Sequence, residues 1–346
     1  AALARFRDTH EETLESYKEA IRLNPNYAIV YTWMAGPLTW LGRYSEAFEA
    51  RAKGLELDPL SIPAISRYVN ELLERMRLDE ARRELEKLAY LRPDSYAIMR
   101  GKLASTDGHW AEWALGALDG LLISPGSRRH LNILTARLAA IGLEQEALAI
   151  QSPLKRRVFV LMMLGRHREA YEAAEEGLAD SPDSLGRRSL LARTLISVGD
   201  EARARTLLEE AWQHNDRRVT RLSAFTPSDA AALLTLRRKA NDEDGVSELL
   251  TAMADNVENL RDAGIVGYGN FVSTDFVEGM TTFLSGDRER GLALIARAVE
   301  AGYFIHPAKF YPPDIYEEPD FAQIQAKQDA IQARERARFL SVVCDD

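Results

Sequence analysis

The polar and apolar positions of the chain alternate between helical stretches and short turns, and prolines punctuate them at a fixed interval. Pro25, Pro59 and Pro93 stand 34 residues apart, and each follows a helical stretch that ends on an apolar-polar step: IRLNP, LELDP and AYLRP. A constant period of this length is typical of a repeat array, in which each unit is one supersecondary element. The length of the chain therefore indicates how many repeats it contains rather than how many globular domains.

Small or apolar residues recur at fixed offsets before each proline. The first three units carry, in one register, Thr13, Tyr17 and Ala20, then Ala47, Arg51 and Gly54, then Ala81, Leu85 and Leu88. Gly42 lies in the turn LGRYSEA, where the first helix must end on a residue that tolerates a positive φ. Small side chains at positions such as Ala47 and Gly54 let two helices approach closely. The predicted unit is helix, turn, helix, proline.

This unit resembles the tetratricopeptide repeat. The family's pattern of aromatic, small, glycine, alanine, small and proline positions is matched in one unit by Tyr31, Ala35, Gly42, Ala47, Gly54 and Pro59. The same offsets return in LGRHREAYEAAEEGLADSP, VGDEARARTLLEEA and FLSGDRERGLALIARAVEAG. The resemblance implies an all-α fold, a right-handed α-solenoid of helix-turn-helix repeats with an irregular C-terminal cap.

We expect the array to cover residues 1–303 in about eight to nine units. The first unit is truncated, and residues 220–264 form a divergent unit that has no glycine at its turn. Residues 304–346 are expected to form a proline- and aromatic-rich loop and a C-terminal helix. The stripe of that helix comprises Phe321, Ile324, Gln328, Ile331 and Phe339. It caps the array or, alternatively, mediates a homodimer or docks a partner.

Counted in the repeat register, Ala1 falls inside a first helix. We therefore expect the sequence to be a segment of a longer protein. The array with its aromatic closing module resembles the C-terminal regions of bacterial regulators. In those proteins a winged-helix, cyclase or kinase domain precedes the repeats.

Composition narrows the classes of function. The net charge of -9 argues against attraction of the whole chain to nucleic acid or anionic lipid. No stretch reaches about 18 uncharged apolar residues, so insertion of this segment into a membrane is not expected. We expect a soluble segment, in the cytoplasm, or in the periplasm if the parent protein has a membrane span upstream.

The sequence contains few residues that could form a catalytic or metal-binding site. Cys344 is the one cysteine, and the six histidines fall singly in different units; His130, flanked by arginines, is expected on a solvated helix surface. There is no HExxH, GxSxG, P-loop or GxGxxG motif. We expect no metal, no cofactor and no catalytic activity.

Charge is distributed unevenly along the chain. Residues 128–239 hold 19 Lys and Arg against 14 Asp and Glu. In the family that the chain resembles, the first helix of each unit lines a concave groove, and its ligand contacts lie at fixed positions of that helix. Carried over to this sequence, these positions fall on Asn70, Lys102, Arg129, Asn132, Lys155, Phe159 and Arg193. Lysine, arginine and asparagine donate several hydrogen bonds, which suits an acidic or extended peptide.

Two functions remain. The first is a non-catalytic scaffold that binds a peptide or protein segment in the groove, as the sensing or assembly part of a larger regulator. The second is a structural or dimerisation arm that positions an upstream catalytic or DNA-binding domain, with its groove filled by its own C-terminal segment. The scaffold leaves Lys155 and Arg193 exposed and convergent, whereas the arm buries them or covers them with residues 301–341.

Overall fold

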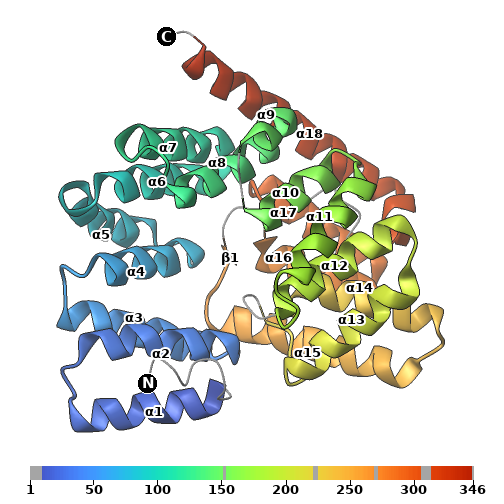
Figure 1. The fold of residues 1–346 in the computed structure, drawn as a ribbon, viewed down its shortest axis with the longest axis horizontal. Coiled ribbons are helices and arrows are strands. Elements are labelled where there is room, and N and C mark those ends of the chain that lie inside the picture. Colours follow the sequence, from blue (N-terminus) through green and yellow to red (C-terminus); the bar gives the residue numbers. More distant parts are fainter. Residues whose placement is uncertain (1–9, 151–152, 221–224, 269–271, 305–312, 345–346) are drawn as a thin grey trace.

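A computed structural model describes residues 10–150, 153–220, 225–268, 272–304 and 313–344. In these residues α-helices follow one another as a solenoid, which confirms the predicted fold class (Figure 1). The first half contains α1 (His10–Leu23), α2 (Ala28–Trp40), α3 (Tyr44–Leu57), α4 (Ile62–Glu74), α5 (Leu78–Leu91), α6 (Pro93–Ala104), η2 (Ser105–Asp107), α7 (Trp110–Ile123), α8 (Arg128–Ala140) and α9 (Glu144–Ala149). The second half contains α10 (Leu154–Met163), α11 (His167–Ala179), α12 (Leu185–Val198), α13 (Glu201–His214), α14 (Pro227–Lys239), α15 (Glu243–Asp262), β1 (Gly267–Tyr268), β2 (Val272–Ser273), α16 (Thr274–Leu284), α17 (Arg288–Glu300), η4 (Pro313–Glu317) and α18 (Pro319–Val343).

From α2 onward, each even-numbered helix packs on the helix that follows it, up to α16 and α17. Small residues make this close packing possible. A Cβ atom at Gly54 of α3 would lie 2.6 Å from Thr32 Oγ1 in α2, and one at Gly116 of α7 would lie 2.5 Å from the Ala97 carbonyl oxygen in α6. Neither position has room for a side chain. Steric exclusion between paired helices therefore explains why the repeat pattern requires small residues there.

The turns inside the pairs need a left-handed residue. Gly42, Gly142, Gly165, Gly199 and Gly286 all have positive φ. The divergent region 220–264 contains the pair α14 and α15, and the same left-handed conformation falls there on Asn241, with φ 56°. Asparagine is one of the few residues that tolerate this conformation.

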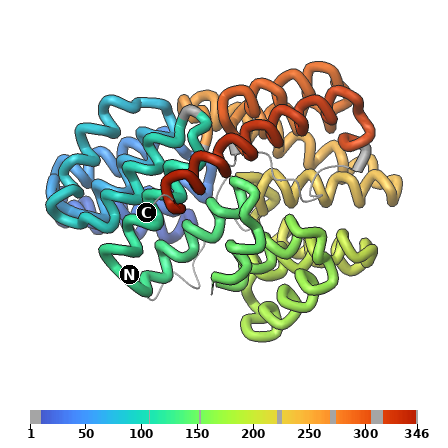
Figure 2. Tube along the Cα trace, turned by 90° about the horizontal axis from the view of Figure 1, so that it is seen from above, coloured from blue at the N-terminus to red at the C-terminus, as the bar shows by residue number. Residues whose placement is uncertain are grey.

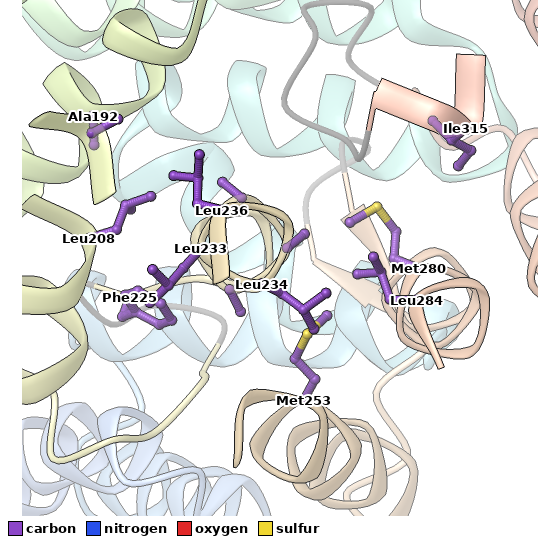
Figure 3. Packing of buried hydrophobic residues seen from close by; sticks show 14 of the residues in the cluster. Ala192, Leu208, Phe225, Leu233, Leu234, Leu236, Met253, Met280, Leu284 and Ile315 are labelled. Atoms are coloured by element: carbon purple, nitrogen blue, oxygen red, sulfur yellow. The ribbon is translucent and has the colours of Figure 1, made fainter. Parts of the chain in front are cut away.

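The core runs along the array between its helix layers, and α14 lies in its largest cluster (Figure 3). Leu233 faces Phe225, and Leu234 faces Met253 of α15. Every one of these four side chains is fully buried. The helix is therefore surrounded by neighbours on several sides. His130 is buried as well, so the expectation of a solvated surface was wrong for this residue; Gly120 leaves the space that its ring fills.

The array turns back on itself, so that its second half contacts its first half (Figures 1 and 2). The Tyr44 hydroxyl of α3 donates a 3.0 Å hydrogen bond to Asn256 Oδ1 of α15. The Trp110 indole N–H of α7 donates a 2.6 Å hydrogen bond to the Gly302 carbonyl oxygen. These contacts join residues about 200 positions apart in sequence and make one closed body.

Helix α18 packs against both α17 and α7, at two distant places in the array (Figure 2). Its buried face comprises Phe321, Ile324, Gln328, Glu335 and Phe339. The apolar stripe expected from the sequence thus lies against this chain's own helices. Residues 305–312 of the proline- and aromatic-rich segment lie outside the described residues. No helix among the described residues has the length and apolar character needed to span a bilayer.

Candidate functional site

The first helices of neighbouring pairs lie on the inner side of the array. Contacts join α8 to α10, α10 to α12, and α12 to α14, whereas the second helices of these pairs approach one another less closely. Helices on the inside of a curved stack are the ones that come together. The inner side is therefore where the concave groove is expected from the sequence, and α8, α10 and α12 form its middle.

Helix α10 carries two consecutive cations, Lys155 and Arg156, and the second contacts a neighbouring inner helix. Arg156 Nε donates a 3.0 Å hydrogen bond to Asn132 Oδ1 of α8. Lys155 reaches solvent, and Arg156 is half-buried. The structure thus brings Asn132, one of the residues expected in the groove, into contact with Arg156, which directly follows Lys155 in the sequence.

On α12, Arg193 is tied to the start of α14. Its guanidinium forms a 2.8 Å ion pair with Asp229 and donates a hydrogen bond to Thr226 Oγ1 at 2.9 Å. Asp229 is fully buried and also accepts from Ser189 Oγ at 2.6 Å. With Thr226, it forms the capping box of α14. Arg193 therefore belongs both to the inner surface and to the packing of α14.

The pKa shifts report which charges lie near one another. Burial among protein atoms lowers the pKa of Lys155, and the charges of Arg193 and then Arg156 lower it further against a smaller opposing effect of Asp229. Burial also lowers the pKa of Arg156. Burial alone would raise the pKa of Asp229, but Arg193 and the hydrogen bonds from Ser189 and Thr226 outweigh it, so that this pKa is lowered. We call Asn132, Lys155, Arg156, Arg193 and Asp229 the cationic cluster.

Arg137 of α8 extends this positive region into the interior. Its guanidinium carbon lies 3.6 Å from the centre of the Trp113 ring, a cation–π contact. Complete burial lowers the pKa of Arg137 well below its usual value, and the charge of Arg156 contributes. Arg137 is thus within electrostatic reach of the cationic cluster.

Two other residues expected in the groove lie where the array closes. The Lys102 ammonium is buried and donates a hydrogen bond to Asn70 Oδ1. Lys102 lines a cavity of about 10 Å³ together with Gly302 and Tyr303 from the end of the array. Burial raises the pKa of Tyr303 to about 12. The chain's own residues therefore cover the Asn70 and Lys102 part of the inner side.

Arg129 and Phe159 complete the expected set, on α8 and α10. Arg129 is exposed at the first turn of α8. Phe159 is half-buried and packs against the apolar cluster that contains Trp110 and Leu134. Among the described residues, no group of three or more His, Cys, Asp or Glu side chains is arranged to hold a metal ion.

Comparison with known families decides the identity of the repeats. A family model described as tetratricopeptide repeat matches residues 161–225. Residues 161–225 carry tetratricopeptide repeat sequence. This match contains α11, α12 and α13, with Arg193 on α12, and the helix pairing and turns described above continue on both sides of it. No curated protein sequence matches the chain.

Solved structures are similar to the tetratricopeptide array at low sequence identity. The crystal structure of yeast Tom70 is 12% identical, covers 99% of this chain and 96% of its own, and has a TM-score of 0.33. The Cut9–Hcn1 hetero-tetramer of APC/C is 12% identical over 96% of this chain and 72% of its own, with a TM-score of 0.43. The human IFIT1 dimer with m7Gppp-AAAA is 14% identical over 99% and 88%, with a TM-score of 0.43. At these scores the similarities carry no information about what this chain binds.

Three residues of the tetratricopeptide inner side were not among those expected from the sequence. Arg156 directly follows the groove position of Lys155, Arg137 lies five residues after Asn132, and Asp229 lies in the divergent unit. Arg156 could have been predicted, because the segment LKRRVF contains three consecutive cations. One of them therefore lies next to the groove position even if the helix is rotated slightly. The role of Asp229 follows only from the packing of α14 against α12.

Proposed function

We propose that this chain is a non-catalytic scaffold that binds an acidic segment of a partner protein on the cationic cluster. The tetratricopeptide fold is that of a protein-interaction scaffold. The observation that carries the proposal is the pairing of charges: of the three cations Lys155, Arg156 and Arg193, only Arg193 has a carboxylate partner in an ion pair among the described residues.

Position supports the same proposal. Lys155 is exposed on α10, directly before Arg156 in the sequence, and after burial among protein atoms the charges of Arg193 and Arg156 both contribute to lowering the Lys155 pKa. Cations gathered in a concave surface attract carboxylates more strongly than the same cations on a flat surface, because low-dielectric walls reduce screening. An extended acidic segment would find several donors along one line.

The alternative, an arm whose groove is filled by its own C-terminal segment, has partial support. Gly302 and Tyr303 do cover the Lys102 end of the inner side. Among the described residues, helix α18 packs mainly against α17 and α7, and none of its side chains forms a hydrogen bond or ion pair with Lys155 or Arg156. We therefore assign partner binding to the cationic cluster and closure of the array to the C-terminal residues. The role as part of a larger regulator stays a proposal that rests on the resemblance alone.

A direct experiment is a titration of the purified chain into a fluorescein-labelled Glu-rich peptide, followed by fluorescence anisotropy. A Gln-rich peptide of the same length and label is the matched control. We expect binding of the Glu-rich peptide that weakens steeply as salt rises, since the attraction is between charges. Equal binding of the two peptides, or binding of neither, contradicts the proposal.

A further inference from the structure

The first half of the array exposes a row of large apolar side chains. Among the described residues, five large apolar side chains are more than half exposed, and all five belong to this half: Leu23, Leu60, Tyr90, Leu122 and Ile123. Single exposed apolar residues are common on protein surfaces and need no explanation. A group of them confined to one place marks a contact surface.

The topology places these five residues at one edge of the helix stack. Leu23 ends α1, Leu60 lies in the turn between α3 and α4, Tyr90 lies near the end of α5, and Leu122 and Ile123 end α7. Neighbouring helices run in opposite directions, so these four helix ends lie on the same side and follow one another, one per repeat (Figure 1). We call the five residues the apolar edge.

The second half of the array shows that the fold does not require such residues there. The corresponding ends of α11 and α13 lead into segments 180–184 and 215–218, which read DSPDS and NDRR. These two helix pairs pack as the pairs of the first half do, although their ends are polar. The apolar edge therefore has a cause outside the packing of a single chain.

Two side chains of opposite charge lie at the middle of the apolar edge. Asp58, in the same turn as Leu60, is exposed and forms no ion pair with a described residue. Arg92, in the next turn, holds Asp94 at 3.1 Å through Nε and at 3.2 Å through one terminal nitrogen, yet its side chain is 51% exposed. A guanidinium has five N–H donors, so Arg92 can still bind a second carboxylate.

The order of these charges makes the edge complementary to itself. When two copies meet with their edges antiparallel, the second turn of one copy lies against the third turn of the other. Asp58 of each copy then faces Arg92 of the other, so the same ion pair forms twice. Parallel edges would instead bring like charges together. A two-fold interface uses the same patch on both copies and needs this kind of self-complementarity.

The size of the edge is that of a stable interface. Five side chains of this size, each more than half exposed, offer on the order of 600 Å² of apolar surface per copy. The turns that carry them add to this area, and each partner in a standard protein interface buries about 800 Å². The edge thus supplies most of the required area from apolar atoms.

We infer that the apolar edge is the interface of a homodimer, in which the two edges run antiparallel about a two-fold axis with Asp58 and Arg92 paired at the centre. This dimer does not involve the C-terminal helix, whose apolar stripe lies against this chain's own helices. It is also independent of the cationic cluster, which lies on α8, α10, α12 and α14.

The first test is the molar mass in solution, measured by light scattering between about 1 and about 100 µM protein. We expect the mass to rise toward twice that of the monomer. Leu60→Ser with Tyr90→Ser should weaken the dimer at least about tenfold, because two apolar contacts are lost from each copy. Leu340→Ser with Val342→Ser, which changes exposed apolar residues of α18, is the matched control and should leave the dimer unchanged.

Two results of this test overturn the inference. A chain that stays monomeric over the whole range has no such interface. Loss of the dimer in the α18 control but not in the edge variant would place the contact on α18. Co-sedimentation of the monomer with phosphatidylcholine vesicles, abolished in the edge variant, would also overturn it, since the edge would then bind a lipid surface.

A charge exchange tests the antiparallel arrangement. Asp58→Arg and Arg92→Asp each place like charges together at both central pairs, so each variant alone should dimerise more weakly than the wild type. In an equimolar mixture of the two variants, a mixed dimer has opposite charges at both pairs again. We expect native mass spectrometry to show that this mixed dimer predominates over either variant paired with itself.

A mixture that dimerises no better than the separate variants overturns the two-fold arrangement, provided that far-UV circular dichroism shows both variants to be folded. Binding of the Glu-rich peptide should be the same for the Leu60→Ser, Tyr90→Ser variant and the wild type. Failure of the dimer therefore leaves the proposed function intact, and failure of peptide binding leaves the dimer intact.

Discussion

Glu335 of α18 accepts a 3.1 Å hydrogen bond from the backbone N–H of Ala111, at the first turn of α7. The two residues are 224 positions apart in sequence. The first N–H groups of a helix have no partner within the helix, and a carboxylate there is also favoured by the helix dipole. Glu335 is almost fully buried and thus serves as the N-terminal cap of a helix far away in the array. This contact helps to hold α18 across the closed solenoid.

Replacing Glu335 should therefore destabilise the whole fold. We expect Glu335→Ala to lower the free energy of unfolding by about 2 kcal/mol, because a charged, buried acceptor is lost from the start of α7. Chemical denaturation measures this change. Asp329→Ala, at an exposed position of the same helix, is the control and should change stability by less than about 0.5 kcal/mol. Equal effects of the two substitutions would show that the Ala111 contact contributes nothing.

A buried hydroxyl joins α3 to α15. Tyr44 donates to Asn256 Oδ1, and both residues are buried. Tyr44→Phe keeps the ring and leaves the amide oxygen of Asn256 without this donor, which we expect to cost about 1–2 kcal/mol in thermal or chemical unfolding. Tyr90 is 94% exposed, so Tyr90→Phe is the matched control and should be silent. A silent Tyr44→Phe would mean that the closure at this place is weak.

The ion pair of Asp229 and Arg193 predicts a pH dependence. The pKa of Asp229 in the folded chain is lowered from its usual 3.8, so its contribution to stability is present above that value and is lost as pH falls through the folded pKa. Asp229→Asn should cost about 3–5 kcal/mol near neutral pH, because Arg193 then lacks its charge partner. Its unfolding free energy should also fall less than that of the wild type between about pH 5 and about pH 3. Asp183→Asn, at an exposed site, should retain the wild-type pH profile.

The repeat pattern predicted most of the fold, because it depends on local requirements. Gly42, Gly165 and Gly199 were expected at left-handed turns and adopt positive φ. Gly54 was expected at a close helix contact and has no room for a side chain. In each case the residue and the neighbours that restrict its size or conformation belong to the same repeat unit.

The repeat pattern could not predict the contacts between the two halves of the array, because these depend on how strongly the array curves. The contacts Tyr44 to Asn256 and Trp110 to Gly302 form only because the array bends through enough units to meet itself. The repeat register contains no information on the sum of these bends. For the same reason Lys102, which has a groove position in its own helix, ends at the closure with Tyr303 rather than in an open groove.

One turn has a left-handed residue other than glycine, and the energetic cost of that residue can be measured. Met76, between α4 and α5, has φ 56°, a conformation that costs a side chain about 1–2 kcal/mol and costs glycine much less. We expect Met76→Gly to raise the free energy of unfolding by about 1 kcal/mol, since Met76 is partly exposed and loses little packing. The reverse change at an equivalent turn, Gly165→Ala, should destabilise by a similar amount. A loss of stability in Met76→Gly would indicate that its side-chain contacts outweigh the backbone strain.

The central claim is that Lys155 and Arg156 form a binding site for a negatively charged partner segment. The most direct measurement compares the affinity of the Glu-rich peptide for two double variants of equal charge. Lys155→Gln with Arg156→Gln removes the two cations of the cluster. Arg157→Gln with Arg168→Gln removes two exposed cations outside it, on α10 and α11. The account predicts that the first variant binds at least about tenfold more weakly than the wild type, while the second stays within about twofold. Equal losses in the two variants would contradict it, because the attraction would then come from overall charge and not from this site.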